Sequence, residues 1–460
     1  MYHSLFLLEL IIQQVSGQSF ATLQPEVHPL MRWESCSSAG CSKQNGSLVL
    51  DAEWRWIHEK NSYTTCFEDG HWLEKGYPNK TLCPDDATCT ENCVLEGTEY
   101  QSMGIWPKND AVTLKYYNYL DYSMSKGARL FMLRPDGKQY NLFKLLNKEI
   151  SFEVDVSKLP CGISADVKFV AMDSNGGFNK FQGNTAGAAY GTGYCDASCP
   201  RDLRFINGQA NVKNWTETPD SPESTVAQYG FGLRGSCCAQ LDVFNGNSIS
   251  SSFGLHPCNF MTPNQHQCIG DGCNPDVSCD AEGCAFNTYR MGNTDFYGPG
   301  GKGVDTTKPF TVVTQFPSTS DTDSGVAFLK EMKRFYIQNG TRFPNGRSKI
   351  DEVPGNSITG PLCTKQKEVF SDVNDFDKFE GMSMIGEYLA QGMVMAIGIW
   401  DDRKTGMAWL DGKLGEGKGA LRGTCPDPAA NIHDLLNSLE GRRASVSFGK
   451  IRVGEIGTTV

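Results

Sequence analysis

Eighteen cysteines spread along a chain of 460 residues restrict the structures that this chain can adopt. Free thiols in such number are hard to maintain outside the cell, so we expect them to form disulfides. The close pairs Cys36/Cys41, Cys83/Cys89 and Cys268/Cys273 could in principle hold zinc, but no closely spaced histidines accompany them. The sequence therefore predicts disulfide-linked loops, with neither a metal site nor a cofactor.

The first residues fit a secretory signal peptide, residues 1–17. MYHSLFLLELIIQQVSG contains an apolar run from Leu5 to Ile12 and then small residues up to Gly17, a pattern that predicts cleavage near Gln18. The run is too short to cross a bilayer, and no other stretch reaches about 18 apolar residues. We expect a soluble, extracellular mature chain without a membrane anchor. Sequons for N-glycosylation begin at Asn45, Asn79, Asn214 and Asn339.

The formal net charge of -11 narrows the range of partners. Nucleic acids and anionic membranes bind through basic patches that replace their counterions, so an acidic chain argues against both. A neutral partner fits this charge better. Most of the acidic side chains are expected to serve solubility.

Segments typical of β-strands dominate the sequence. They are SLVLDAEWRWIH (47–58), EISFEVDVSKL (149–159), ADVKFVAMD (165–173), PFTVVTQF (309–316), MVMAIGIWDD (393–402) and SVSFGKIRVGEIG (445–457). Only residues 373–391 have the apolar spacing of a helix of useful length, and the 49 glycines fit a helical protein poorly. The sequence predicts an all-β, two-sheet sandwich. Because there is no internal repeat or Ser/Thr/Pro-rich linker, we expect residues 18–460 to form a single domain.

Several long and irregular blocks of sequence are specific enough to indicate a family. They are NTAGAAYGTGYCDASCPRDLRFINGQANV, YRMGNTDFYGPG, IWDD with MAWLD, and GSCC followed by NSIS and HPC. Through these blocks nearly all of residues 18–460 resembles glycoside hydrolase family 7, the cellobiohydrolases and endoglucanases that cleave β-1,4-glucans with retention of configuration. The resemblance implies a β-jelly-roll sandwich of two large curved antiparallel sheets. Its long disulfide-linked loops would form a glucan-binding cleft, with no attached carbohydrate-binding module.

The family's catalytic signature is Glu-x-Asp-x-x-Glu directly after a double cysteine, and GSCCAQLDVFNGNSIS (235–250) stands in its place. The resemblance puts Gln240 at the nucleophile position, Asp242 at the residue that tunes the nucleophile, and Asn245 at the acid/base position. Retaining hydrolysis needs one ionised and one protonated carboxyl group about 5–5.5 Å apart. A carboxamide has neither an anionic oxygen nor an acidic proton, so we expect a catalytically silent or severely impaired protein.

Other positions that match glucan-contacting residues of the family are retained. Four indole rings, at Trp54, Trp56, Trp400 and Trp409, are expected to stack on the apolar faces of sugars. His256 matches a residue near the leaving-group side of the catalytic centre. The remaining polar matches are Tyr194, Asp196, Asp202, Arg204, Arg290, Asp401 and Arg422.

Some contacts depart from the family pattern. Arg204 replaces a lysine, which keeps the charge and changes the geometry, and Ser164 and Lys168 stand where cellobiohydrolases have asparagine and tyrosine. The segment from Cys273 to Cys279 is shorter than the corresponding loop of tunnel-forming members and lacks their substrate-contacting arginine. We therefore expect an open, endoglucanase-like groove near the centre, with altered affinity at these subsites.

The resemblance also implies a partner for each of the 18 cysteines. The implied bonds are Cys36–Cys41, Cys66–Cys93, Cys83–Cys89, Cys161–Cys425, Cys195–Cys238, Cys199–Cys237, Cys258–Cys279, Cys268–Cys273 and Cys284–Cys363. A further family bridge would need cysteines at Phe20 and Val94, and both are absent together. Paired loss is expected, because an orphaned thiol is reactive in an oxidising compartment.

Three functions are compatible with these features. We favour a secreted monomer that binds β-1,4-glucan, or a related wall polysaccharide, without cleaving it. The alternative is a retaining glucanase, of endoglucanase or cellobiohydrolase type, with residual or altered activity in which Asp242 or another carboxylate supplies slow turnover. In the third, the cleft is vestigial and the partner is a protein.

Overall fold

The computed structural model describes residues 17–70, 73–120, 123–180, 183–215, 230–260, 264–319, 328–402, 405–426 and 438–460. Apart from Gly17, the predicted signal segment lies outside these residues. Among the described residues, no helix has the length and apolar character needed to cross a membrane.

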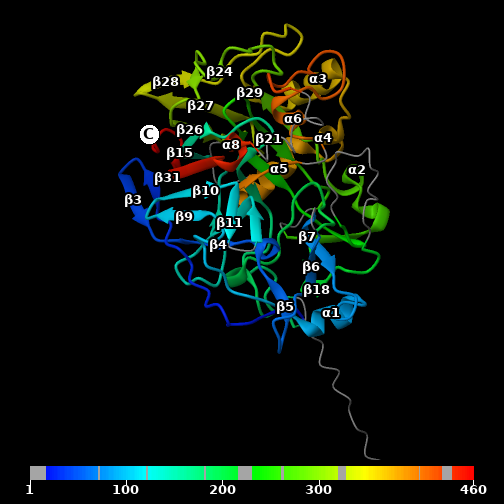
Figure 1. Cartoon of the computed structure of the whole chain (residues 1–460). Coiled ribbons are helices and arrows are strands. Elements are labelled where there is room, and N and C mark those ends of the chain that lie inside the picture. Colours follow the sequence, from blue (N-terminus) through cyan, green and yellow to red (C-terminus); the bar gives the residue numbers. More distant parts are fainter. Residues whose placement is uncertain are drawn as a thin grey trace, which may run out of the picture.

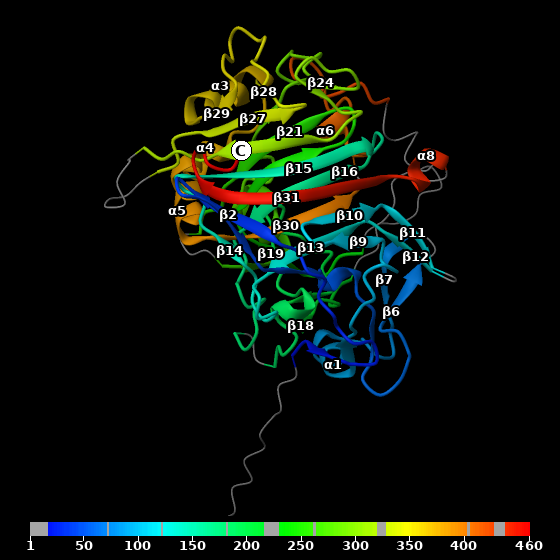
Figure 2. The ribbon, with the colours of Figure 1, turned by 90° about the vertical axis from the view of Figure 1, so that its left-hand side faces the viewer.

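Two mainly antiparallel sheets pack face to face (Figures 1 and 2). The ten-stranded outer sheet has the order β28 (Thr341–Pro344), β27 (Met332–Gln338), β26 (Phe310–Gln315), β15 (Lys148–Lys158), β31 (Ser445–Glu455), β10 (Ala111–Lys115) and β9 (Ile105–Lys108), with β2 (Trp33–Ser37), β3 (Gly40–Gln44) and β29 (Ser357–Ile358) paired beside it. The eight-stranded inner sheet has the order β23 (Cys284–Asn287), β21 (Ser251–His256), β20 (Gln240–Gly246), β16 (Ser164–Val170), β30 (Met393–Trp400), β13 (Ala128–Leu133) and β4 (Ser47–Leu50), with β14 (Leu142–Phe143) paired to β30. The predicted all-β sandwich is confirmed.

Short strand pairs shape the loops around the sandwich. They are β1 (Ser19–Phe20) and β5 (Ile57–Glu59) with β8 (Cys93–Leu95), β6 (Phe67–Gly70) with β7 (Leu73–Pro78), β11 (Tyr117–Leu120) with β12 (Ser123–Lys126), β17 (Phe205–Ile206) with β18 (Gln209–Ala210), β19 (Arg234–Cys237) with β22 (His266–Ile269), and β24 (Tyr297–Gly298) with β25 (Val304–Asp305).

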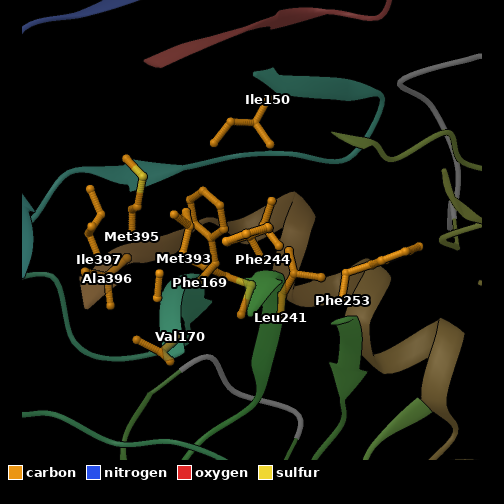
Figure 3. Packing of buried hydrophobic residues seen from close by; sticks show 14 of the residues in the cluster. Ile150, Phe169, Val170, Leu241, Phe244, Phe253, Met393, Met395, Ala396 and Ile397 are labelled. Atoms are coloured by element: carbon orange, nitrogen blue, oxygen red, sulfur yellow. The ribbon is translucent and has the colours of Figure 1, made fainter. Parts of the chain in front are cut away.

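Large apolar side chains fill the space between the two sheets. Ile150 and Phe152 of β15 are buried, as are Phe169 of β16 and Leu241 and Phe244 of β20. Figure 3 shows Ile150 facing Phe169 and Phe244 across this space. Burial of an apolar side chain of this size contributes about 1.5–3 kcal/mol, so the core holds the inner sheet firmly from one side and leaves its other face available for a site.

The helices differ from the sequence prediction. Residues 373–391 form two helices, α4 (Asp375–Lys378) and α5 (Gly381–Gln391), because Glu380 between them has a left-handed backbone with φ 52°. The expectation of only one useful helix is also wrong, since α3 (Gly360–Phe370) is as long as α5. The buried side of α3 includes Gln366 and Lys367, so apolar spacing alone does not reveal it.

The remaining helices are short. They are α1 (Asp86–Asn92), α2 (Pro275–Ser278), α6 (Ala408–Asp411), α8 (Leu439–Arg442) and the 3-10 turns η1 (Ala52–Trp54), η2 (Ala188–Tyr190) and η3 (Gly270–Cys273). Helix α1 lies at the end of the molecule opposite α3 (Figures 1 and 2).

The predicted strand over residues 47–58 is interrupted. β4 ends at Leu50, and the carboxylate of Asp51 accepts a hydrogen bond of 2.9 Å from the backbone N–H of Glu53. This contact starts η1, since an aspartate at such a position satisfies an otherwise unpaired N–H. The turn ends in Trp54.

Nine disulfides join all 18 cysteines, in the pairs that the family resemblance implies. Cys66–Cys93 and Cys83–Cys89 belong to a small separate core beside α1. Two others, Cys195–Cys238 and Cys199–Cys237, tie the loop around residues 194–204 to the chain immediately before β20. The second pair of bonds fixes that loop over the inner sheet.

Candidate functional site

Strand β20 carries three polar side chains on the open face of the inner sheet: Gln240, Asp242 and Asn245. A spacing of i, i+2 and i+5 would put the third on the opposite face of a regular strand. The register on both sides of β20 shifts between Asp242 and Asn245, so that Val243 and Phe244 together lie opposite a single residue of β21. Such a β-bulge inserts one extra residue and returns Asn245 to the face of the other two.

The bulge is held from the core side. Phe244 is fully buried, with its ring centroid 6.3 Å from that of Phe152 and 6.2 Å from that of Phe310, both in the outer sheet. The guanidinium of the buried Arg334 donates to the carbonyl of Val243 and to Thr314 Oγ1, the latter at 2.9 Å. The core therefore fixes the backbone that positions the three polar groups.

On the open face, the carboxylate of Asp242 is the centre of a closed hydrogen-bond cluster. Gln240 Nε2 donates to Oδ1 at 2.7 Å, and Asn245 Nδ2 donates to Oδ2 at 2.8 Å. His256 Nε2, from the neighbouring strand β21, lies 3.1 Å from the same Oδ2. Because an ionised carboxylate only accepts, both amides must turn their NH2 groups toward it. We call these four residues the amide cluster.

The amide cluster holds Asp242 as a carboxylate. Burial alone would raise the pKa of Asp242, but the charge and hydrogen bond of His256, the charge of Lys168 and the Gln240 hydrogen bond together bring it below its usual value. Burial would likewise lower the pKa of His256, and the Asp242 carboxylate outweighs this and raises it. The cluster is thus an aspartate–histidine pair whose carboxylate also accepts from two amides, and none of its members is a protonated carboxyl group.

Two adjoining cavities extend along this face, and we call them together the groove. The first, of about 490 Å³, is lined by side chains that include Trp54, Tyr194, Asp196, Asp202, Trp400 and Asp401. The second, of about 660 Å³, is lined by side chains that include Gln240, Asp242, Asn245, His256, Arg290, Trp409 and Arg422. Lys168, Asp196 and Trp400 line both cavities, so they mark the junction between the two.

Three of the four expected indole platforms lie in the groove. Trp400 ends β30 and Trp409 belongs to α6, and their ring centroids are 6.0 Å apart with an interplanar angle of 28°. Trp54 lines the first cavity, and its Nε1 donates to the carbonyl of Lys126 at 3.0 Å. Trp56 lines neither cavity; its side chain is exposed and packs on the ring of His58.

The arginines predicted for the site differ in their surroundings. Arg290 makes two hydrogen bonds to the carboxylate of Asp372, at 2.9 and 2.7 Å. Burial and then the charge of Arg290 lower the pKa of Arg422 to about 10. Arg204 lines neither cavity, and its guanidinium donates to the carbonyls of Ala52, Glu53 and Arg55. In this structure Arg204 therefore supports the turn that carries Trp54.

Sequence reasoning placed Lys168 at an altered contact position but missed Asp166, the other charged residue of the groove floor. Asp166 and Lys168 lie on the open face of β16, and the ladder places them directly opposite Asn245 and Asp242. Both line the first cavity. Their alternation in ADVKFV predicts a shared face, but the register against β20 could not be read from the sequence.

The clusters of metal-capable side chains in this structure consist mainly of disulfide-bonded cysteines. In the described part of the chain, three clusters bring together metal-capable atoms: Cys66, Cys83 and Cys93; Cys199, Cys237 and Cys268; and Cys161, Asp411 and Cys425. Every cysteine in them is bonded to another cysteine. A sulfur in a disulfide offers no thiolate to a metal, so these clusters serve as covalent links.

Comparison with protein-family models gives one match, which spans almost the whole chain. Residues 20–460 match the model described as Glycosyl hydrolase family 7.

Solved structures similar to this chain include cellulases of both types. A family 7 cellobiohydrolase from Daphnia pulex is 37% identical with a TM-score of 0.89, and covers 96% of this chain and 100% of its own. A cellobiohydrolase from Melanocarpus albomyces complexed with cellotetraose is 34% identical with a TM-score of 0.86, at the same coverage. An endoglucanase I complexed with cellobiose is 32% identical with a TM-score of 0.78, and covers 95% of this chain and 98% of its own.

Proposed function

This chain belongs to glycosyl hydrolase family 7, and from that premise we propose that it is a secreted protein that binds β-1,4-glucan in the groove without cleaving it. Its similarity to a cellobiohydrolase that was solved with cellotetraose and an endoglucanase solved with cellobiose supports a glucan as ligand. The nine disulfides are consistent with secretion.

The amide cluster is the observation that carries the proposal. On the family assignment, Gln240 and Asn245 occupy the positions of the nucleophile and the acid/base. Both amides donate to Asp242, whose two oxygens are already used by Gln240, Asn245 and His256. A glycosyl ester needs an anionic oxygen that is free to attack, and the leaving oxygen needs a proton from a neutral carboxyl. The cluster offers neither.

Binding does not need those carboxylates. Trp54, Trp400 and Trp409 present indole rings to the groove, and sugars stack on such rings through their apolar faces. Charged and hydroxyl groups along the same walls can orient the sugar hydroxyls. Recognition and cleavage are therefore separable in this groove.

A residual hydrolase is the second candidate, because one carboxyl group remains beside the amide cluster. Asp166 lies opposite Asn245 in the ladder, and burial raises its pKa despite the opposing charge of Lys168. A protonated Asp166 would be an acid within the groove floor. Under this alternative, slow turnover depends on Asp166 and on Asp242 in place of the missing glutamates.

Calorimetric titration of the purified protein with cellotetraose and cellohexaose tests the proposal, together with reducing-sugar release over several days. We expect saturable binding and no release of sugar. Steady release that is abolished by both Asp166→Asn and Asp242→Asn would favour the residual hydrolase. The same two variants serve as controls for a contaminating cellulase, whose activity would not respond to either change. Absence of both binding and release would leave a protein partner as the remaining function.

A further inference from the structure

Lys168 stands at the junction of the two cavities. It lies on β16 between Asp242 on β20 and Ala396 on β30, in one row across the inner sheet. The next row places Asp166 beside Gly398, where a Cβ would come within 2.2 Å of Asp166 Oδ1. Small residues on β30 thus leave room for the two charged side chains in the floor of the groove.

The ammonium group of Lys168 has one carboxylate and two aromatic rings near it, and these contacts leave it able to bind a further anion. Nζ lies 3.4 Å from Asp166 Oδ2, 5.4 Å from the ring centroid of Tyr194 and 6.0 Å from that of Trp400. Aromatic faces attract a cation but do not neutralise it. Burial lowers the pKa of Lys168, and Tyr194, Asp166 and Asp196 outweigh this and raise it, so the side chain stays charged.

The Asp166–Lys168 contact is looser than the bonds of the amide cluster. Charge-assisted N–H···O bonds are usually about 2.7–2.9 Å long, and this one is 3.4 Å. Within the described part of the chain, the buried Oδ1 of Asp166 has no hydrogen-bond partner. Asp166 is therefore a weak counterion for Lys168.

Nearby charges are already engaged elsewhere. Asp196 accepts hydrogen bonds from Tyr194 Oη at 2.7 Å and from Ser198. Arg129 Nε donates to Asp51 at 2.7 Å. Asp242 is balanced by His256, as described above. Asp402, which also lines both cavities, accepts a hydrogen bond from Thr405 Oγ1. Among these described charges, Lys168 is the one whose contacts leave capacity for a ligand.

The centre of this groove would also repel an acidic ligand less than a retaining centre with an ionised nucleophile would. Gln240 and Asn245 carry no charge, and Lys168 stands where the family resemblance has a neutral tyrosine. Gln240 in place of an ionised nucleophile and Lys168 in place of a tyrosine each make the local potential more positive, whereas Asn245 replaces an acid that is neutral when protonated. At separations of 4 Å or so, one unit charge in a partly buried site changes an interaction by several-fold or more.

From these contacts we infer that the groove prefers a β-1,4-linked glycan in which a pyranose carries an anionic substituent, a carboxylate or a sulfate, and that Lys168 Nζ binds this anion while the sugar stacks on Trp400. The inference rests on the proposed function, since it assigns a ligand class to the same groove. Lys168 is then the residue that determines specificity between acidic and neutral glycans.

The experiment compares three ligands by calorimetry: cellopentaose, cellopentaose oxidised at C6 to carboxylates, and cellopentaose sulfated at C6. We expect the unmodified protein to bind at least one anionic ligand about 10-fold or more tightly than the neutral one, the usual strength of a hydrogen bond to a charged group. Lys168→Met removes this preference, so that the anionic and neutral ligands bind this variant within about threefold of each other. The tighter of the two anionic ligands identifies the substituent.

Further variants separate the charge effect from misfolding. The double variant Asp166→Asn/Lys168→Met leaves no unpaired charge in the floor and also loses the preference. Asp166→Asn alone removes the counterion and strengthens the preference several-fold. Lys450→Met, on β31 of the outer sheet with a side chain 63% exposed, is the matched control and leaves it unchanged.

The outcomes for the two proposals are distinct. If neutral cellopentaose binds and neither anionic ligand binds more tightly, the preference for anions is disproved while glucan binding stands. A preference that persists in the double variant also disproves the role of Lys168. If none of the three ligands binds, the proposed function fails and the inference falls with it.

Discussion

The two faces of strand β20 carry different parts of the site: one face carries the packing residues that shape the backbone, and the other carries the polar groups at the catalytic positions. Its core face buries Leu241, Val243 and Phe244, and these residues build and hold the β-bulge. Its open face carries Gln240 and Asn245 around Asp242. The backbone that places three side chains in one row is intact, whereas two of the three functional groups that a retaining mechanism needs there are carboxamides.

This difference shows that the positions of the three side chains and their functional groups depend on different residues of the chain. The bulge depends on packing between the sheets and on the buried Arg334, and a change from carboxylate to carboxamide on the other face affects neither. The amides are also compatible with the retained aspartate, because each has an N–H to donate to it. The hydrogen bonds of the amide cluster therefore order this face without two carboxylates at these positions.

The largest predicted effect comes from placing carboxylates at the two amide positions, which tests whether the core face of β20 still positions them. If the core face still places the side chains correctly, Gln240→Glu combined with Asn245→Glu should raise the rate of cello-oligosaccharide hydrolysis by about 10²–10⁴-fold, the usual contribution of a positioned acid/base. Each single variant should stay nearly silent, because the nucleophile and the acid act together. Reducing-sugar release measures the rate.

A double variant that folds and binds glucan but remains silent would contradict this view. It would mean that the groove around the centre has lost the contacts that orient the sugar for attack. In that case the altered positions Ser164 and Lys168 are the first to examine.

The next largest effect is expected for a substitution on the core face of β20, measured as the free energy of unfolding. Phe244→Ala should lower the free energy of unfolding by about 3–5 kcal/mol, because it empties a fully buried aromatic site between the sheets. Phe178→Ala is the matched control, since this phenylalanine is 42% exposed, and it should cost less than about 1 kcal/mol. Denaturant unfolding of both variants tests the difference. A loss below about 1 kcal/mol for Phe244→Ala would show that the core does not hold the bulge.

Much of the fold was predictable from the sequence, for physical reasons. Strands β15, β16, β26, β30 and β31 coincide with segments rich in β-branched and aromatic residues, which suit a half-buried pleated surface. The interruption at Asp51 depends on a side-chain cap, and the break at Glu380 on one left-handed residue. Neither the cap nor the left-handed residue changes the spacing of apolar residues, so this spacing does not predict the two interruptions.

The site was predictable residue by residue only through the family resemblance. The pairing of Asp166 and Lys168 with Asn245 and Asp242 depends on a bulged register that no local pattern encodes. Arg204 illustrates the opposite case: its sequence position matches a glucan contact, but its guanidinium is occupied by three backbone carbonyls. Which polar group is free to meet a ligand is set by tertiary contacts.

The ion pair within the amide cluster predicts a pH-dependent stability. Unfolded aspartate and histidine titrate near 3.8 and 6.5, and in the folded protein the pKa of Asp242 is lowered and that of His256 raised. The Asp242 contribution is present above its unfolded pKa and is lost as pH falls through the lowered value. The His256 contribution is complete below its unfolded pKa and is lost as pH rises through the raised value. Their joint contribution is therefore greatest between about pH 4 and 6.5.

Asp242→Asn should flatten this profile and lower the free energy of unfolding near pH 5 by about 1.5–3 kcal/mol, the cost of removing hydrogen bonds to a charged group. Denaturant unfolding measured from pH 3 to pH 8 gives the profile. Asp351→Asn, at an exposed aspartate, is the control and should leave the profile unchanged. An unaltered profile in Asp242→Asn would show that neither Asp242 nor its pairing with His256 contributes to the pH dependence of stability.

The smallest predicted effect separates residues that the structure places in the groove from one that only the resemblance places there. Trp409 lines the second cavity and lies beside Trp400, whereas Trp56 lines neither cavity. Trp409→Ala should weaken binding of cellotetraose by about 1–1.5 kcal/mol, roughly 5- to 10-fold, because a stacked ring is lost. Trp56→Ala should leave it within about twofold, as expected for a residue away from the ligand. Equal losses in calorimetry would mean that the groove extends past Trp54 to the rim, and that the open face of the sheet binds glucan over a longer path than the two cavities define.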